Sequence, residues 1–269
     1  MRKITFFPAF LLSFLLASNA FGWSFAVAGD SRDDRDGIFP RILSEVDRSD
    51  MEFLLHTGDL ENRGGDAAWG AFRKRTGKFR KPLHVVLGNH ELRKPGTREG
   101  FAKFFGLTGT NYSFAHKNAH FAIVDNAGGS LPAETLAWLD RDLEDHPKGK
   151  GGIAVLIVAM HAPPRTDGIF PHGTVSEYGE QSERLLEILK RRKVDALLCS
   201  HEHLHYVEDW GGVRVVVSGG AGAPLYPFQR YGYYRIDVEK GTVREKFRRV
   251  RPARRRRESG GARTQEAFP

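Results

Sequence analysis

The sequence predicts an α/β fold (of the α+β type) with four layers, in which two mixed β-sheets pack face to face and helices cover their outer faces. Between residues 23 and 200 short apolar runs alternate with helical stretches, and beyond them only strands are expected. This order of elements is typical of two packed sheets with helices outside. With 40% hydrophobic residues the chain is too apolar to be disordered. No repeat or linker interrupts residues 23–247, so we expect one domain there.

The individual elements follow from the apolar runs and the turn residues between them. Pro132 suits the first turn of a helix, and the Gly-Gly and Lys-Gly pairs at 211–212 and 240–241 mark turns. In chain order we expect strands at 23–29, 51–58, 83–88, 111–116, 120–125, 153–160, 194–200, 203–210, 213–218, 231–238 and 243–247. Helices are expected at 38–48, 66–79, 131–145 and 180–193.

The N-terminal segment is typical of a secretory signal peptide. Arg2 and Lys3 precede an apolar, uncharged run at residues 4–17, and small residues suited to cleavage follow it. The run is shorter than the roughly 20 residues that a membrane-spanning helix needs, so cleavage is favoured over a retained anchor. We expect residues 1–22 to be removed and the mature protein to be exported, to the periplasm or the cell exterior, with no stable membrane span.

Positive charge is concentrated at the two ends of the chain. Of the net charge of +8, residues 244–269 carry +7 and the N-terminal pair carries +2, so residues 4–243 carry −1. We expect the arginine-rich residues 248–269 to form a disordered tail, because like charges repel. The tail could contact an anionic surface weakly, but a solvated tail is favoured. No aromatic residues separate its arginines, so specific nucleic-acid binding is not expected. The only cysteine, Cys199, excludes an intrachain disulfide.

Side chains of the kinds that bind metals follow five of the expected strands. Ligands bind beyond the carboxyl ends of the strands in α/β sheets, so we expect these side chains to converge on one pocket. Mixed carboxylate, amide and imidazole ligands suit Mn²⁺, Fe or Zn²⁺ better than Mg²⁺ or Ca²⁺. The residues are Asp30, Asp59, Asn89, His161, His201 and His203.

These motifs, in this order, resemble those of the calcineurin-like metallophosphoesterases, which include purple acid phosphatases and cyclic-nucleotide phosphodiesterases. The family pattern is D-x-H, G-D-x-x-x-R, G-N-H-[DE], an apolar strand that ends in His, and G-H-x-H. The matching segments here read GDSR, GDLENR, GNHE, VAMH and SHEH, and the match runs from residue 30 to residue 203. The resemblance implies a two-metal site at the mouth of a metallophosphoesterase-like β-sandwich.

The resemblance also implies which residues hold two divalent transition metal ions (Mn, Fe or Zn). Asp59 would bridge the ions. Asp30 and His203 would complete the first metal site, and the second would be completed by Asn89, His161 and His201. Two such ions clamp the attacking and leaving oxygens of an in-line displacement, and a metal-bound hydroxide would be the nucleophile.

Further residues are expected to assist the reaction. By the resemblance, His90 stands at the position of the proton donor to the leaving group. Glu91 could orient the His90 ring as a carboxylate behind it. We also place Asn62 and His205 among the residues that contact the substrate or support the ligands.

Arg32 is the main departure from the family pattern. It stands where D-x-H has its histidine, and a guanidinium cannot ligate a metal. Either the first site binds its metal weakly, through Asp30, Asp59, His203 and water, or Arg32 binds the substrate phosphate bidentately and shares its charge with one metal. We favour the second alternative and count Arg32 with His90 as catalytic.

One motif in the same region points to a different chemistry. Residues 201–205 also satisfy H-E-x-x-H, the pattern of zinc proteases, which requires a helix. The segment follows a short apolar strand, and in an extended chain His201, His203 and His205 would point to one side. That arrangement favours the phosphoesterase interpretation.

The sequence therefore predicts an exported, metal-dependent phosphohydrolase that cleaves a phosphate mono- or diester of a small molecule. The alternative is a non-catalytic protein on the same scaffold, with a weakened first metal site, that binds a phosphorylated ligand or a partner. His90 favours the enzyme, because it has no ligating task.

Overall fold

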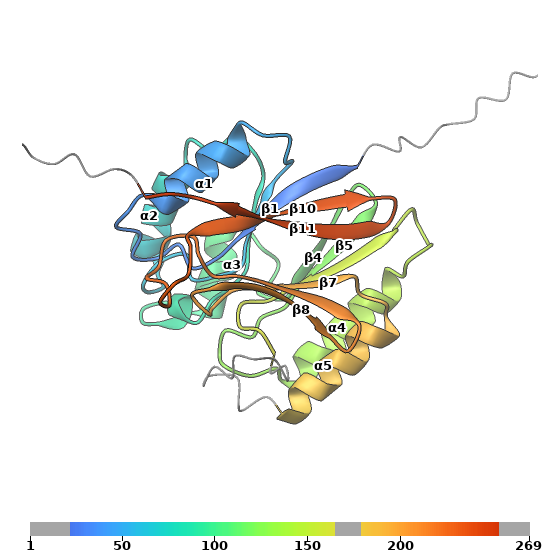
Figure 1. Cartoon of the computed structure of the whole chain (residues 1–269). Coiled ribbons are helices and arrows are strands. Elements are labelled where there is room, and N and C mark those ends of the chain that lie inside the picture. Colours follow the sequence, from blue (N-terminus) through green and yellow to red (C-terminus); the bar gives the residue numbers. More distant parts are fainter. Residues whose placement is uncertain (1–21, 165–178, 253–269) are drawn as a thin grey trace, which may run out of the picture.

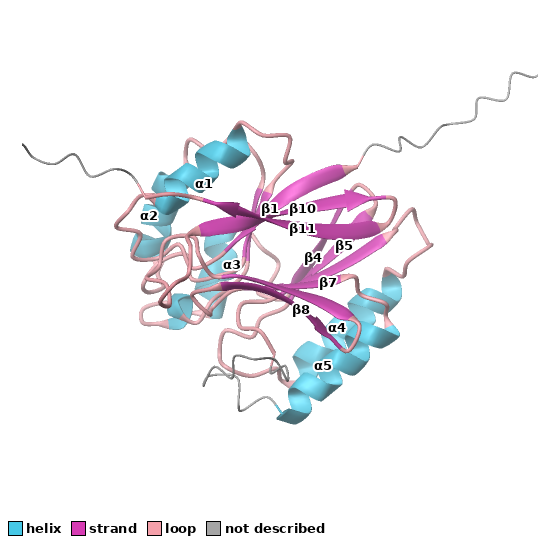
Figure 2. Ribbon diagram, in the orientation of Figure 1, coloured by secondary structure: helices cyan, strands magenta, loops and turns pink. Residues whose placement is uncertain are grey.

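The computed structural model of the chain describes residues 22–164 and 179–252, and it confirms the four-layer α/β architecture. Two mixed sheets lie between two groups of helices (Figure 1). Figure 2 shows the helices on opposite outer sides of the strands. The N-terminal segment expected to be a signal peptide lies outside the described residues, apart from residue 22.

The first sheet has a parallel centre and antiparallel outer strands. β1 pairs in parallel with β2, and β2 with β3, while β10 joins β1 and β11 antiparallel. The strand order is β11-β10-β1-β2-β3. The strands are β1 (Trp23–Ala28), β2 (Leu54–His56), β3 (Leu83–Val85), β10 (Gly232–Glu239) and β11 (Thr242–Arg249).

The second sheet is also mixed, with order β4-β5-β6-β7-β9-β8. Its four central strands are parallel, and β4 and β8 are antiparallel edge strands. The strands are β4 (Tyr112–His116), β5 (Ala119–Ile123), β6 (Val155–Ala159), β7 (Ala196–Cys199), β8 (His205–Trp210) and β9 (Val213–Ser218). The parallel strands of both sheets therefore direct several carboxyl ends toward one region.

Helices cover the outer face of each sheet through apolar surfaces. The first sheet packs on α1 (Ile38–Asp47), α2 (Asp66–Thr76) and α3 (Arg98–Phe105), and the second on α4 (Ala133–Asp145) and α5 (Gly179–Arg191). Between the sheets lies an aromatic core. Phe25 stacks on Phe53 with ring centroids 4.7 Å apart, and Phe121 meets Phe25 edge-on at 5.3 Å. Burial of these rings supplies much of the driving force for sheet packing.

Several element boundaries differ from those expected. β2 and β3 are shorter than predicted: β2 begins only at Leu54, and both strands end early, where the chain enters the loops that carry polar residues. α3 was not predicted: it is eight residues long, contains Gly100, and depends on Thr97, whose side chain accepts the Gly100 N–H. β11 continues to Arg249 and Val250 is buried, so the folded part extends beyond residue 247, where we expected the tail to begin.

Within the described ranges, no helix is long and apolar enough to cross a membrane. The remainder of the basic tail, from residue 253, lies outside those ranges.

Candidate active site

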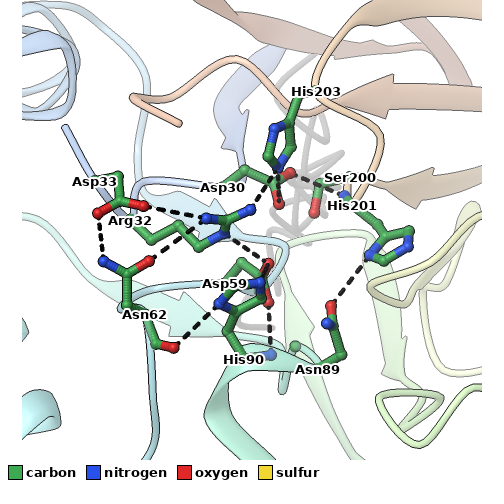
Figure 3. A network of polar contacts seen from close by, with 12 residues as sticks. Asp30, Arg32, Asp33, Asp59, Asn62, Asn89, His90, Ser200, His201 and His203 are labelled. Carbon is green, nitrogen blue, oxygen red and sulfur yellow. Dashed lines mark hydrogen bonds and ion pairs between the residues drawn. The ribbon is translucent and has the colours of Figure 1, made fainter. Parts of the chain in front are cut away.

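The candidate ligands gather where five strands end. Loops after β1, β2 and β3 carry Asp30, Asp59 and Asn89, and loops after β6 and β7 carry His161 and His201. Figure 3 shows side chains from both sheets pointing toward one another. The structure thus brings together the six predicted metal-ligand positions, His203 included, as expected for carboxyl ends at one sheet edge.

Three of these residues have a left-handed backbone. Asp30, Asp59 and His201 have φ angles of 60°, 56° and 67°. Such conformations cost on the order of 1–3 kcal/mol each and persist only when the surroundings enforce them. They turn the chain sharply at the strand ends, so that the side chains point into the pocket. This is the local reason that these positions differ from ordinary turn residues.

The residues predicted for the second metal site gather around the Nε2 atom of His161. This atom lies 3.0 Å from Asn89 Oδ1, 3.1 Å from His201 Nδ1 and 3.3 Å from Asp59 Oδ1. The His161 Nδ1–H donates to the Thr57 carbonyl at 2.9 Å, which leaves the Nε2 lone pair facing these acceptors. Several lone pairs converge on one small buried volume. The donor set therefore fits a divalent transition metal ion.

The residues predicted for the first metal site surround an arginine side chain instead. Asp30, Asp59 and His203 surround it, and the Nε2 of His203 lies 3.7 Å from Asp30 Oδ1. The Arg32 guanidinium lies among them: Nε donates to Asp59 Oδ2 at 3.2 Å and Nη2 lies 3.1 Å from His203 Nε2. The Nδ1–H of His203 donates to the Pro224 carbonyl at 2.7 Å, so its Nε2 accepts from Arg32.

Arg32 is not free to form the bidentate phosphate contact that we expected. Its Nη1 donates to Asp33 Oδ2 at 3.3 Å and to Asn62 Oδ1 at 3.4 Å, in addition to the two contacts above. Asn62 in turn donates to Asp33, which closes the network (Figure 3). A guanidinium has five N–H donors, and the described residues use four of them. A bidentate grip on phosphate would require breaking contacts that the protein already makes.

Glu91 has a different role from the one that we assigned. Each of its contacts in the described structure is with a backbone N–H group rather than with the His90 ring. Its carboxylate accepts from Asp59 and Gly88 at 2.9 Å through Oε2, and from Leu60 at 2.9 Å and Glu61 at 3.2 Å through Oε1. It thereby joins the loops after β2 and β3. Burial, followed by the Asp59 charge, raises the pKa of Glu91 to about 8, although these N–H groups oppose the shift.

The His90 ring is oriented by the backbone of Asn62 instead. The Nδ1–H of His90 donates to the Asn62 carbonyl at 3.1 Å, and Nε2 lies 3.7 Å from Asp59 Oδ2. Burial lowers the pKa of His90 to about 4, although the Asp59 charge acts in the opposite direction. The ring is therefore neutral at neutral pH, with its Nε2 lone pair beside the metal sites.

His205, which we placed near the substrate, lies outside this arrangement. Residues 201–204 form bends rather than an extended strand, and His201 is left-handed, so the three histidines do not share one side. The His205 ring packs on Tyr234 and Phe247, and neither ring nitrogen has a hydrogen-bond partner among the described residues. Burial lowers its pKa to about 3. The segment is not helical either, which excludes the zinc-protease interpretation.

The electrostatics of the buried carboxylates favour a cation. Burial and the Asp59 charge raise the pKa of Asp30 well above its usual range. Burial would also raise the pKa of Asp59, but His161 and His90 outweigh it and lower that pKa. Two carboxylates this close disfavour joint ionisation unless positive charge lies between them.

Three supporting residues were missed by the sequence analysis. From α2, Arg75 donates to the Ser31 and Leu60 carbonyls at 3.2 and 2.8 Å, and so ties together the loops after β1 and β2. Asn126 accepts the His161 N–H at 3.0 Å, and Thr57 offers the carbonyl that orients His161. No short motif contains these residues, so only the fold reveals them.

A second group that could hold a metal lies near the opposite end of β5. It comprises His120, Asp142 and His146. His120 Nε2 lies 2.7 Å from Asp142 Oδ2, and His146 Nδ1 donates to the Asp142 carbonyl at 2.8 Å. These mutual contacts explain why the three side chains lie close together without a bound metal.

Comparison with known proteins agrees with this geometry. The sequence model of the calcineurin-like phosphoesterases matches residues 24–205. The chain belongs to the calcineurin-like phosphoesterase family. This membership confirms the resemblance seen in the motifs, and it supports phosphoester hydrolysis as the chemistry of the site.

The names of its relatives and structural neighbours state different activities. The chain is 23% identical to a 3',5'-cyclic adenosine monophosphate phosphodiesterase of Haemophilus influenzae, over 80% of this chain and 81% of that protein. It is 24% identical to a probable glycerophosphodiester phosphodiesterase of Arcobacter nitrofigilis, over 62% of each protein. The chain thus spans less than two thirds of the latter relative.

Solved structures confirm the fold. A purple acid phosphatase from yellow lupin superimposes with a TM-score of 0.64 at 16% identity, over 85% of this chain and 52% of that one. GAP50, described as the anchor in the inner membrane complex of Plasmodium, also has a TM-score of 0.64 at 16% identity, over 84% of each chain. At these identities the likeness shows the fold alone, so the function must be argued from the site.

Gly88 should not tolerate a side chain. A Cβ atom there would lie 2.3 Å from the Asp59 backbone nitrogen and 2.4 Å from its Oδ1. We expect Gly88→Ala to lower the free energy of unfolding by at least about 2 kcal/mol and to weaken metal binding, because Asp59 must move. Gly70 lies in α2 with open space around it, so Gly70→Ala should stabilise the protein by about 0.5–1 kcal/mol. Denaturant unfolding measures both; equal stability of the two variants would contradict this account.

His205 should contribute to acid sensitivity rather than to metal binding. Because its folded pKa is lowered to about 3, the unfolded chain takes up this proton first, and stability falls as the pH drops below about 6.5. When the pH falls from 6.5 to 5, the free energy of unfolding should decrease in the metal-free unsubstituted protein. In the metal-free His205→Leu variant this decrease should be smaller by about 1–2 kcal/mol. Its metal content should be unchanged. Loss of bound metal in this variant would contradict this account and show that His205 supports metal binding.

Proposed function

We propose that this protein is an exported, metal-dependent hydrolase of a small phosphoester, either a monoester or a diester. Family membership supports the reaction class, and the relatives named as phosphodiesterases make diesters the first substrates to test. Export is part of the proposal because the N-terminal 20 residues have the composition of a signal peptide.

The observation that carries the proposal is the convergence of acceptor atoms on His161 Nε2. Oxygen or nitrogen atoms of Asn89, His201 and Asp59 lie within 3.0–3.3 Å of it. Asn89 Oδ1, Asp59 Oδ1 and His161 Nε2 face this point with lone pairs, and a cation bound between them would satisfy all three together. We therefore propose that Asp59, Asn89, His161 and His201 hold a divalent transition metal ion (Mn, Fe or Zn). The second ion that the family implies would have to share its site with Arg32.

When bound, such an ion polarises a phosphoryl oxygen and lowers the pKa of water toward neutrality. The residues of this chain supply the rest. His90 presents Nε2 beside Asp59 in a neutral ring, and the negative charge of a bound phosphoester raises the pKa of that ring. His90 Nε2 then takes up a proton from solvent and gives it to the leaving oxygen. The Asn62 carbonyl accepts from the Nδ1–H of His90 and so holds the ring in the orientation that this transfer needs.

Replacing Asp59 tests the proposal as a whole. We expect Asp59→Ala to abolish hydrolysis of mono- and diester substrates and to lower metal content, because this carboxylate faces both metal sites. The measurements are elemental analysis and turnover on a substrate panel. Asp66, exposed at the start of α2, offers a matched control: Asp66→Ala should retain both properties. Turnover near that of the unsubstituted protein in Asp59→Ala would exclude the proposed mechanism.

Replacing His90 tests the proton transfer separately. His90→Ala should keep its metal but lose about 10²–10⁴ in turnover, the usual contribution of general acid catalysis. The loss should be smaller for an activated aryl ester, whose leaving group needs no proton. His146→Ala, at a half-exposed histidine remote in the chain, serves as the control. Equal losses for activated and unactivated esters would remove the acid role from His90.

A further inference from the structure

Arg32 lies where the family implies a metal ion. The first site would bind through Asp30 Oδ1, Asp59 Oδ2 and His203 Nε2. Two of these three atoms already accept hydrogen bonds from the Arg32 guanidinium, at 3.2 and 3.1 Å. His203 Nε2 has a single lone pair, so it cannot ligate a metal while it accepts the Arg32 N–H; Asp59 Oδ2 keeps a second lone pair, but the guanidinium lies in front of it. As this site stands, its donor set does not fit a metal ion.

We propose that the Arg32 guanidinium replaces the first metal ion, so that the chain binds a single divalent cation, at the Asp59, Asn89, His161 and His201 site. This inference rests on the proposed function, because it concerns the same centre. It also revises the role of Arg32: its guanidinium is a fixed positive charge of the site and does not bind the substrate phosphate bidentately.

The guanidinium is held in this place from the other side as well. Its Nη1 donates to Asp33 and Asn62, which are themselves hydrogen-bonded to each other. The Arg32 side chain is only 15% exposed. An arginine anchored to four side chains differs from a surface arginine that swings aside to admit an ion, because each anchor must be broken before it moves.

Charge balance also favours a single ion. One divalent cation and one guanidinium already compensate the carboxylates of Asp30, Asp33 and Asp59 around them. A second divalent cation within a few ångströms of Arg32 would be repelled by it and by the first ion in a buried setting.

Asp30 retains one oxygen for the remaining ion. Its Oδ2 accepts the His201 N–H at 2.8 Å, whereas the buried Oδ1 has no hydrogen-bond partner among the described residues. A ligand atom of Asp30 lies with atoms of Asp59 and His161 within 4.8 Å of one another. These three residues can therefore face one cation together with Asn89 and His201.

The experiment counts metal ions in the full chain after loading with excess Mn²⁺. Elemental analysis should give a single Mn²⁺ per chain, and electron paramagnetic resonance should show an uncoupled ion. Arg32→His restores the family's ligand and removes the guanidinium, so it should bind a second Mn²⁺ and show a coupled pair. Arg32→Ala serves if Arg32→His fails to fold, and should also admit a second ion, at least about tenfold more weakly. Arg35→His, at an exposed arginine three residues away, should keep the single ion.

Two Mn²⁺ ions with a coupled signal in the unsubstituted chain would overturn the inference. So would a single ion in folded Arg32→His and Arg32→Ala, or no ion in the unsubstituted chain. Activity distinguishes this failure from failure of the proposed function. Two bound ions with phosphoester turnover would overturn only the inference, whereas one bound ion without turnover would support it and overturn the proposed function.

Discussion

The buried carboxylate of Glu91 is the contact on which the geometry of the site depends. It accepts four backbone N–H groups, three from the loop after β2 and one from the loop after β3. Those loops carry Asp59 and Asn89, so one side chain sets the spacing between the two ligands. Three of these contacts are buried, so the acceptor also removes the cost of leaving buried amides unpaired. With these loops fixed, sheet packing brings the ends of β6 and β7 against them, and the histidine ligands follow.

The same constraint explains why the ligand loops can keep a strained backbone. Asp30 and Asp59 have positive φ angles, and the Asp30 N–H donates to the Gly58 carbonyl at 3.0 Å, which links the two strained turns. A Cβ at Gly58 would lie 2.5 Å from His161 Nδ1, so the loops from the two sheets are in close contact there. At Asp30 and Asp59 the strained conformation coincides with a candidate ligand, and a dense set of hydrogen bonds maintains it.

The fold and the ligand positions could be predicted because their signals are local in the sequence. Strand–helix alternation gave the layers, and polar residues directly after apolar strands gave the ligands. The roles of Glu91 and His205 could not be predicted in this way. Glu91 acts through amides of another loop, and His205 turned away because the left-handed His201 breaks the extended geometry that we assumed. Arg75 was missed for the same reason: its partners lie 15 and 44 positions away.

The replacement of a metal ion by the Arg32 guanidinium separates two functions that a pair of metal ions performs together. A metal ion both neutralises charge and activates water, whereas a guanidinium only neutralises charge, since it has no vacant coordination position. In this site the activation must then come from the ion held by His161 and its neighbours, and Arg32 balances the carboxylates without any need for metal loading. Asp33 and Asn62, which hold the guanidinium, thereby become part of the electrostatic design of the centre, although neither is positioned to bind the ion at His161.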